Sequence, residues 1–285
     1  MIPDEFVGAV LAWGGPSLRD LPWRRTRDPW AVLVSEVMSQ QTQVHRVIPK
    51  WERFMDRFPT PERCAAASLA EVLELWQGLG YPRRARDLHR SAQIIDGRGG
   101  VPDQLDDLLA LPGVGDYTAR AVMAFAFGAD VAVVDTNVGR VLARVIGERL
   151  TPRRVREIAD DLVPTGDGWL WNQALMDLGG TLCVARSPEC QSCPARTWCV
   201  WNGSVDIDDP AVGSAGVSSR QSRFKGSRRE ARGRLLRALV SGELSLREAA
   251  AVMERSPAES AEIVDGLISD GLVVCTDGRL RLPGV

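Results

Sequence analysis

Long hydrophobic runs are missing from this chain of 285 residues. No apolar segment approaches the roughly 20 residues that a membrane-spanning helix requires, which excludes a helical membrane protein. The first residues, Met1 to Glu5, contain neither a basic leader nor an apolar core segment, so we expect no signal peptide. We therefore expect a soluble, cytoplasmic protein without disulfide bonds, because thiols stay reduced in that compartment.

The chain also has no large excess of positive or negative charge. The formal net charge is −2 and the pI is about 5.9, which argues against a nucleic-acid partner for the chain as a whole. However, between Arg220 and Arg237 eight basic residues accompany the single acid Glu230, for a net charge of +7. Arginines also cluster at 24–27 and 83–90. Each patch alone is weak evidence, but together they fit a polyanionic partner.

Helical spacing of apolar residues dominates the chain up to residue 180. Breakers such as Gly78-Leu-Gly80 and Pro164 divide the pattern into short elements. Only Val131 to Val134 resembles a strand, and four residues do not make a sheet. We predict an all-α bundle with helices at 4–13, 29–41, 44–57, 68–77, 83–96, 104–110, 116–127, 137–147, 152–163 and 169–179.

The composition changes after Cys199. Residues 204–226, rich in Gly, Ser, Asp and Val, are typical of a linker. Helical patterns follow near 227–240, 245–253 and 257–269, and two alternating runs flank Asp277-Gly278, which is typical of a β-hairpin. We interpret residues 227–285 as a small winged-helix-like module. Such a module can bind DNA or dock to a protein.

Four of the six cysteines form a C-x6-C-x2-C-x5-C run. Four thiolates at this spacing converge on one centre and indicate a metal ion or an iron-sulfur cluster. Structural zinc sites usually show two close pairs, whereas here only Cys190 and Cys193 form one. Iron-sulfur clusters accept less regular spacings. The spacing favours a cluster and leaves zinc open, with Cys183, Cys190, Cys193 and Cys199 as the ligands.

A glycine turn, Leu111-Pro112-Gly113-Val114-Gly115, joins two predicted helices. Its glycines allow positive φ, and the turn leaves backbone amides at a helix N-terminus where a phosphate can accept them. A plain helix connection is the alternative, but this pattern favours phosphate binding without base preference.

Two carboxylates are candidates for chemistry. Asp135 follows an apolar run and begins a helix, where it, Thr136 or Asn137 could serve as the N-cap. Glu36 lies in a strongly apolar helix, either at the edge of its buried face or in a pocket of low dielectric. Burial there would raise its pKa and suit it to donate a proton. Spacing alone leaves both alternatives open for Glu36.

A series of motifs over residues 5–203 resembles the MutY-type adenine DNA glycosylases of the helix-hairpin-helix superfamily. The cysteine spacing of 6, 2 and 5 also matches the [4Fe-4S] loop of that superfamily. The resembling motifs, in chain order, are Leu21-Pro-Trp-Arg24, Asp28-Pro29, Val34-Ser-Glu-Val-Met38, Gln40-Gln-Thr-Gln-Val44, Gly78-Leu-Gly-Tyr81, Leu111 to Gly115, Val134-Asp-Thr-Asn-Val138, Asn172 to Gly179 and the four cysteines.

The resemblance implies excision of adenine mispaired with 8-oxoguanine or guanine in double-stranded DNA. Glu36 would protonate the adenine at N7, and Asp135 would stabilise the oxocarbenium sugar, as paired carboxylates do in glycoside hydrolysis. The resemblance further implies that Tyr117 and Asn137 assist them. It implies that Trp23, Arg24 and Gln173 line the adenine pocket, that Gln41 and Tyr81 wedge into the base stack, and that Leu111, Gly113, Val114 and Gly115 contact DNA.

The resemblance also implies a domain plan. The helix-hairpin-helix core would span 1–203, with a six-helix part at 21–131 and a terminal, iron-sulfur part at 1–20 and 132–203. The linker at 204–226 and the module at 227–285, which composition and periodicity indicate, would follow. We expect a monomer associated with the nucleoid.

Lysine is scarce, and this bears on the reaction. A glycosylase that also cuts the DNA backbone forms a Schiff base through an amine, but Lys50 and Lys225 are the only lysines and neither is near the hairpin, where this chain has Tyr117. We therefore predict a monofunctional enzyme. A thymine or uracil mismatch glycosylase of the same superfamily, or a non-catalytic iron-sulfur DNA-binding protein, are the alternatives.

Departures from the family pattern leave the opposite base open. Residues 227–285 have no room for the Nudix-like domain with which well-known members recognise 8-oxoguanine. Ser39 stands where a leucine is usual, and Pro82 stands where a second tyrosine is common.

Overall fold

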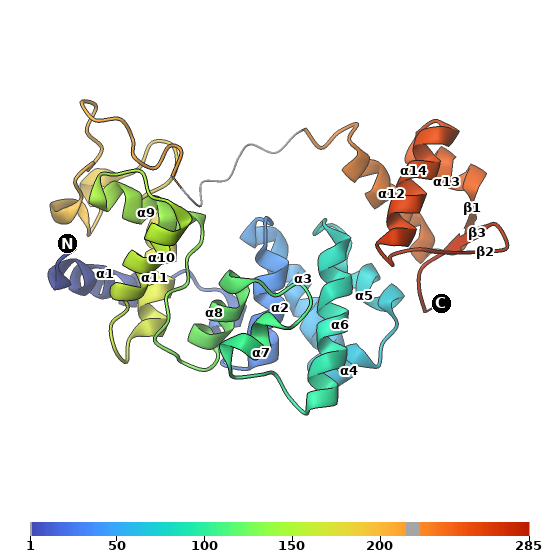
Figure 1. The fold of residues 1–285 in the computed structure, drawn as a ribbon, viewed down its shortest axis with the longest axis horizontal. Helices are drawn as coiled ribbons and strands as arrows, with labels where there is room; N and C mark the ends of the chain where they lie inside the picture. Colours follow the sequence, from blue (N-terminus) through green and yellow to red (C-terminus); the bar gives the residue numbers. More distant parts are fainter. Residues whose placement is uncertain (1, 215–222, 285) are drawn as a thin grey trace. The chain divides into compact units, whose positions relative to one another are not determined.

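The structure, a computed structural model, describes residues 2–214 and 223–284 (Figure 1). Helices make up most of it, which confirms the all-α prediction. Its contacts form two compact units. Unit 1 comprises residues 1–32, 103–105 and 115–220, and unit 2 comprises residues 33–102, 106–114 and 221–285.

Unit 1 is built around α11 (Gly168–Thr181), which is buried along most of its length. Helix α1 (Asp4–Ser17) packs closely on α11, because a Cβ on Gly14 would lie 2.3 Å from the Cβ of Ala174. Phe6 and Trp171 meet edge to face at 6.0 Å between ring centroids. The other elements of unit 1 are η1 (Pro22–Arg25), α8 (Asp116–Phe125), α9 (Thr136–Ile146), α10 (Pro152–Asp161), η2 (Cys190–Ser192) and η3 (Arg196–Trp198).

Unit 2 begins within α2 (Pro29–Ser39), whose first residues belong to unit 1. Helix α6 (Pro82–Arg98) is its centre and packs against α4 (Pro61–Ala65) and α5 (Leu69–Trp76). Ser68 and Glu71 form a capping box that starts α5. Helices α3 (Val44–Arg57) and α7 (Leu105–Leu109) complete this part.

The C-terminal module, residues 228–284, also belongs to unit 2. It contains α12 (Arg228–Val240), α13 (Leu246–Met253) and α14 (Pro257–Ser269) and an antiparallel sheet in the order β1 (Leu244–Ser245), β3 (Arg279–Arg281), β2 (Val274–Thr276). Asp277 and Gly278 have φ values of 50° and 74°, as a two-residue hairpin turn requires. The predicted hairpin is therefore confirmed.

The elements differ from the sequence expectation in several places. The prediction omitted α4, which is a single turn, the two-residue strand β1 and the short helices η1, η2 and η3. The run Val131 to Val134 forms no strand, because the side chain of Asn172 binds its backbone, accepting from the amide of Val133 at 2.8 Å and donating to the carbonyl of Val131 at 2.9 Å. Residues 204–214 of the predicted linker pack on unit 1, while 215–222 lie outside the described residues; the predicted domain boundaries stay a prediction.

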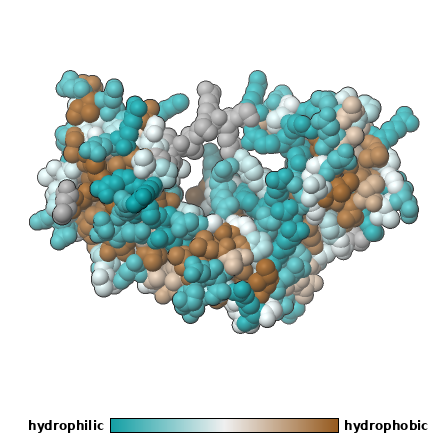
Figure 2. Space-filling model, viewed as in Figure 1, coloured by the Kyte–Doolittle hydropathy of each residue, from teal (hydrophilic) through white to brown (hydrophobic). Residues whose placement is uncertain are grey.

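Figure 2 shows hydrophilic side chains over most of the face in view, with hydrophobic ones in separate patches. Among the described helices, none has the length and apolar character needed to cross a lipid bilayer.

Candidate active site

Asp135 is the N-cap of α9. Its Oδ1 accepts hydrogen bonds from the amides of Asn137 and Val138, both at 2.8 Å. Asp135, Thr136 and Asn137 could each cap this helix by residue type, and in the structure Asp135 is the N-cap. Burial raises the pKa of Asp135 above 3.8, although these hydrogen bonds and the nearby Arg140 oppose the rise. The carboxylate is thus both structural and desolvated.

Asn137 orients the second oxygen of that carboxylate. Its Nδ2 donates to Oδ2 of Asp135 at 2.7 Å, and its Oδ1 accepts from Nη2 of Arg140 at 2.7 Å. Arg140 also donates to the carbonyls of Cys183 at 2.7 Å and Gly179 at 2.6 Å. A partly buried chain of hydrogen bonds therefore joins Asp135 to the start of the cysteine run.

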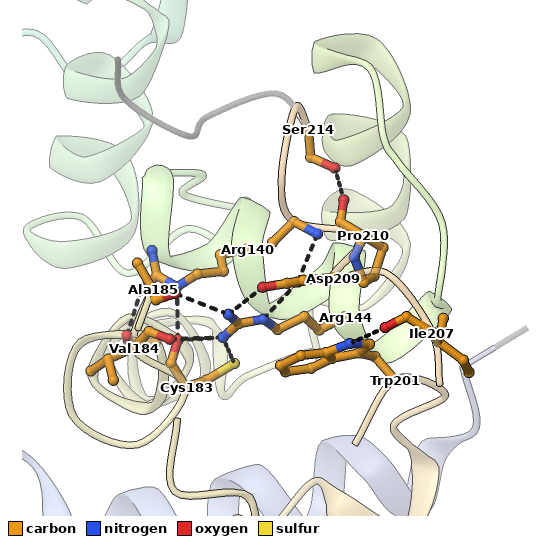
Figure 3. A network of polar contacts seen from close by, with 12 residues as sticks. Arg140, Arg144, Cys183, Val184, Ala185, Trp201, Ile207, Asp209, Pro210 and Ser214 are labelled. Carbon is orange, nitrogen blue, oxygen red and sulfur yellow. Dashed lines mark hydrogen bonds and ion pairs between the residues drawn. The ribbon is translucent and has the colours of Figure 1, made fainter. Parts of the chain in front are cut away.

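Arg144 fastens the cysteine run from the next turn of α9 (Figure 3). Its Nη1 donates to Sγ of Cys183 at 3.3 Å and to the carbonyl of Val184 at 2.8 Å. Asp209 pairs with its Nη2 at 2.7 Å, and the guanidinium carbon lies 4.5 Å from the ring centroid of Trp201. Hydrogen bonds from Arg144 lower the pKa of Asp209 against the opposing effect of burial. This network holds residues 204–214 on unit 1.

The four thiols of the run lie within electrostatic reach of one another, and all six cysteines are free. Burial, with a smaller effect of neighbouring thiolates, raises the pKa of Cys193 to about 11. Sγ of Cys199 accepts from the amide of Asn202 at 3.2 Å. Within residues 2–214 and 223–284, no three His, Cys, Asp or Glu side chains are arranged to hold a metal ion as they stand. The chemistry of the set, four thiols with N–H donors aimed at sulfur, nevertheless suits a thiolate-bound group.

The residues expected around the adenine lie in unit 1 and are largely buried. Trp23 is 8% exposed and Gln173 is 5% exposed. Arg24 follows Trp23 in η1, but Asp177 of α11 occupies its guanidinium, with Nη1 to Oδ2 at 2.7 Å and Nη2 to Oδ1 at 2.9 Å. Hydrogen bonds from Arg24 and Arg19 lower the pKa of Asp177 although burial opposes this. Arg24 therefore anchors η1 to α11 in this structure.

Glu36 lies in unit 2, in the middle of α2, and is only 8% exposed. Neighbours Ser35 and Val37 are buried as well. The structure thus supports the buried alternative rather than the edge alternative for this carboxyl group. Tyr117 lies half-buried in the first turn of α8, in unit 1.

The two expected wedge residues, Gln41 and Tyr81, lie in unit 2 and both have left-handed backbones, with φ of 55° and 47°. Such φ values cost about 1–3 kcal/mol for a non-glycine residue and persist only where the surroundings impose them. Arg84 supplies that constraint, with its guanidinium carbon 5.3 Å from the ring centroid of Tyr81. Its hydrogen bonds go to the carbonyls of Val37, Met38, Gln40, Leu79 and Gly80 and to Oγ1 of Thr42.

The glycine turn is fixed to α6. Gly113 has φ of 75°, and a Cβ there would lie 2.9 Å from the Cβ of Asp87. Oγ of Ser91 donates to the carbonyl of Pro112 at 2.9 Å. Gly115 is the N-cap of α8 and offers no side chain to its first amides. Gly113 therefore has the positive φ that the sequence predicted, whereas Gly115 has φ of −97°. Phosphate binding at this turn stays a prediction.

Sequence reasoning missed four residues that organise these groups: Asp177, Arg84, Arg140 and Arg144. Arg140 and Arg144 lie one turn apart on the apolar face of α9. Because a buried charge needs a partner, the sequence could have indicated that both arginines are paired. Arg84 was noticed only as part of a charge cluster, which gave no signal for its contacts.

Comparisons with known proteins show which family this chain resembles. The HhH-GPD superfamily of base excision DNA repair proteins matches residues 34–165. An adenine DNA glycosylase of Mycolicibacterium smegmatis is 42% identical over 285 residues, which cover 96% of this chain and 95% of that protein. A thermostable thymine-DNA glycosylase superposes with a TM-score of 0.66 and 32% identity, covering 70% of this chain and 95% of that chain. Endonuclease III in a non-covalent DNA complex gives a TM-score of 0.61 and 27% identity, covering 71% of this chain and 98% of that chain.

The fold and these matches define a helix-hairpin-helix protein of base excision DNA repair. Within that superfamily, the chain belongs to the MutY-type adenine DNA glycosylases.

Proposed function

We propose that this protein is a monomeric, monofunctional glycosylase that hydrolyses the N-glycosidic bond of adenine mispaired with 8-oxoguanine or guanine. The observation that carries the proposal is the 42% identity to an adenine DNA glycosylase across 96% of the chain. Its place of action would be the chromosomal DNA of the nucleoid.

Glu36 is the proposed proton donor. A carboxyl group at 8% exposure in an apolar helix is shielded from water, which suits it to keep a proton until the base is bound. Protonation at N7 makes adenine a neutral leaving group.

Asp135 is the proposed stabiliser of the oxocarbenium sugar. Its Oδ1 is bound at the N-terminus of α9 and its Oδ2 by Asn137, so the anion has a fixed orientation before the charge develops on the sugar. We assign Asn137 this orienting role, and we propose that Tyr117 assists the reaction.

The proposed DNA contacts involve the mispaired adenine, the base stack and a phosphate. Target atoms are unreachable inside a duplex, so the adenine must be extruded. We propose that Trp23 and Gln173 line its pocket, that Arg24 positions η1, and that Gln41 and Tyr81 enter the stack it leaves. Leu111, Gly113, Val114 and Gly115 would present backbone groups to a phosphate.

We propose that Cys183, Cys190, Cys193 and Cys199 hold a [4Fe-4S] cluster. The support is family membership together with the sulfur-directed donors of Arg144 and Asn202. A bound cluster would cross-link this loop, and the loop reaches Asp135 through the hydrogen bonds of Arg140 and Asn137. Replacement Cys193→Ala should remove the brown absorbance and weaken DNA binding; full DNA affinity without the cluster would contradict this role.

The monofunctional assignment has its own test. Borohydride reduction traps a Schiff base between an amine and the abasic sugar. We expect no trapped complex with the wild type. If the wild type is trapped and Lys50→Gln is not, lyase chemistry through Lys50 occurs and the monofunctional assignment is wrong.

The activity is tested with four duplexes, which place A opposite 8-oxoguanine, A opposite G, T opposite G and U opposite G. We expect adenine release by the wild type and by Glu52→Gln, an exposed control on α3, and no release by Glu36→Gln, which should still bind. Release of thymine or uracil alone would favour the second candidate, a mismatch glycosylase like the 32% identical thymine-DNA glycosylase. No release from any duplex would leave a non-catalytic DNA-binding protein.

A further inference from the structure

The C-terminal module is bound to α6 through one carboxylate. Asp270 ends α14 and is 7% exposed. Its Oδ1 lies 2.5 Å from Nη2 of Arg83 on α6, and its Oδ2 pairs with Arg232 of α12. The backbone carbonyl of Asp270 accepts from Nη1 of Arg86, one turn further along α6. Two arginines of the glycosylase core and one of the module thus meet at a single residue.

A second contact lies at the end of the chain. A Cβ on Gly284 would approach that of Ser68, the N-cap of α5, to 3.0 Å, and α12 contacts α5. Although burial opposes it, hydrogen bonds from Arg83 and Arg232 lower the pKa of Asp270, so the carboxylate is charged at neutral pH. The module is therefore anchored at both α5 and α6.

The charge on α14 argues against DNA reading by this module. In a winged helix, the second helix of the helix-turn-helix pair enters the major groove, and α14 has that place after α13. Its exposed side chains include Glu259, Glu262 and Asp265, and residues 257–269 contain no lysine or arginine. Duplex DNA carries a negative charge about every 1.7 Å along its axis and would repel such a surface.

The anchored residues adjoin the strained turn. Tyr81, with φ of 47°, is the N-cap of α6, so Arg83 and Arg86 lie within its first two turns. Arg84 fixes the turn from the α2 side, and Asp270 holds the same segment from the module side. A backbone in the left-handed region needs such constraints on more than one side.

We propose that the C-terminal module is an internal support for the Tyr81 turn rather than a DNA reader, with Asp270 as the positioning residue. The functional part of the inference rests on the proposed role of Tyr81 as a wedge. The structural part, that Asp270 restrains the segment 78–86, stands independently of it.

Hydrogen exchange in the full-length protein tests the structural part. We expect Asp270→Asn to speed amide exchange across residues 78–86 by about tenfold or more, because local opening loses an anchor. Asp265→Asn, the same change on the exposed face of α14, should leave that segment unchanged. If Asp270→Asn unfolds the module, Arg83→Gln removes the same pair from the core side and should give the same acceleration. Unchanged exchange in a folded variant overturns the proposal.

Binding to mismatched and matched duplexes tests the consequence. We expect Asp270→Asn to lower the preference for the mismatched duplex about fivefold or more, while Asp265→Asn and Glu262→Gln change neither affinity. A gain in affinity for both duplexes with the latter two variants would place α14 against DNA and overturn the assignment. If the wild type shows no preference for a mismatch, the proposed function fails, and the exchange measurement still decides whether Asp270 supports the turn.

Discussion

Nη2 of Arg140 lies 2.7 Å from Oδ1 of Asn137, and this contact fixes which way the Asn137 amide faces. With Oδ1 turned to Arg140, Nδ2 must donate to Asp135, as observed at 2.7 Å. The same guanidinium binds the carbonyl of Cys183 at 2.7 Å. The proposed sugar stabiliser and the first residue of the cysteine run therefore share one arginine.

Replacing this arginine with lysine should slow the reaction. Lysine keeps the charge but cannot bind Asn137, Gly179 and Cys183 with one rigid fork, so the single-turnover rate of Arg140→Lys should fall about 10- to 100-fold. Rapid-quench measurement of adenine release checks this. Arg153→Lys on α10, where the side chain is 90% exposed, is the matched control and should keep the wild-type rate. An undiminished rate in Arg140→Lys would contradict the positioning role.

Asp135 should make the stability of the protein depend on pH. Folding raises its pKa above 3.8, so the folded state binds the proton more tightly, and this residue costs stability increasingly as the pH rises above 3.8. As the pH rises from 4 to 7, the melting temperature of the wild type should therefore decrease relative to that of Asp135→Asn. Calorimetry at several pH values checks this, with Asp161→Asn on α10 as the baseline. The rate should also drop on the acid side as Asp135 gains its proton. A pH-independent offset between the proteins would refute the desolvated environment.

Arg84 should control discrimination rather than chemistry. Burial lowers the pKa of Arg84 to about 10, so its guanidinium stays charged at neutral pH. It binds the backbone carbonyls that precede Gln41 and Tyr81. In Arg84→Lys three hydrogen-bond donors replace five. We expect the affinity for mismatched DNA to weaken about tenfold, with a smaller change in the rate of adenine release from the bound complex. Fluorescence anisotropy and single-turnover kinetics separate the two effects. Arg98→Lys, an exposed change on the same helix, serves as control; equal losses in both variants would show a general charge effect.

Gly179 should tolerate no side chain. A Cβ there would lie 2.6 Å from the Cβ of Asn137 and 2.9 Å from its carbonyl oxygen. Gly179→Ala should lower the free energy of unfolding by about 1–3 kcal/mol and displace Asn137 from Asp135. At the next residue, a Cβ on Gly180 would meet only the tip of Arg19, at 3.9 Å. Gly180→Ala should be neutral or stabilising by about 0.5–1 kcal/mol. Denaturant unfolding measures the difference in free energy of unfolding between the two variants. Equal stabilities would show that α11 moves away from α9 to accept the added methyl group.

The sequence by itself determined most of the elements. Apolar spacing and breakers placed α3 at Val44–Arg57 and α14 at Pro257–Ser269, because helix periodicity and capping residues are local properties. The Asp277-Gly278 hairpin followed from two alternating runs and from the preference of Asp-Gly for positive φ, which are also local properties. Residue type and motif order likewise indicated Glu36, Asp135 and the four cysteines as candidates, whose roles stay proposals.

Only the tertiary structure decided which side chains restrain these candidates. Asp135 and Cys183 are 48 positions apart in the sequence, yet both are held through Arg140, and Asp270 of the module meets Arg83 of α6 across a still longer separation. Burial likewise distinguished a shielded Glu36 from one at a helix edge. A guanidinium carries several donors whose partners are mostly carbonyls, which every residue possesses, so the sequence carries no mark of which ones it will meet; packing of distant helices makes that choice.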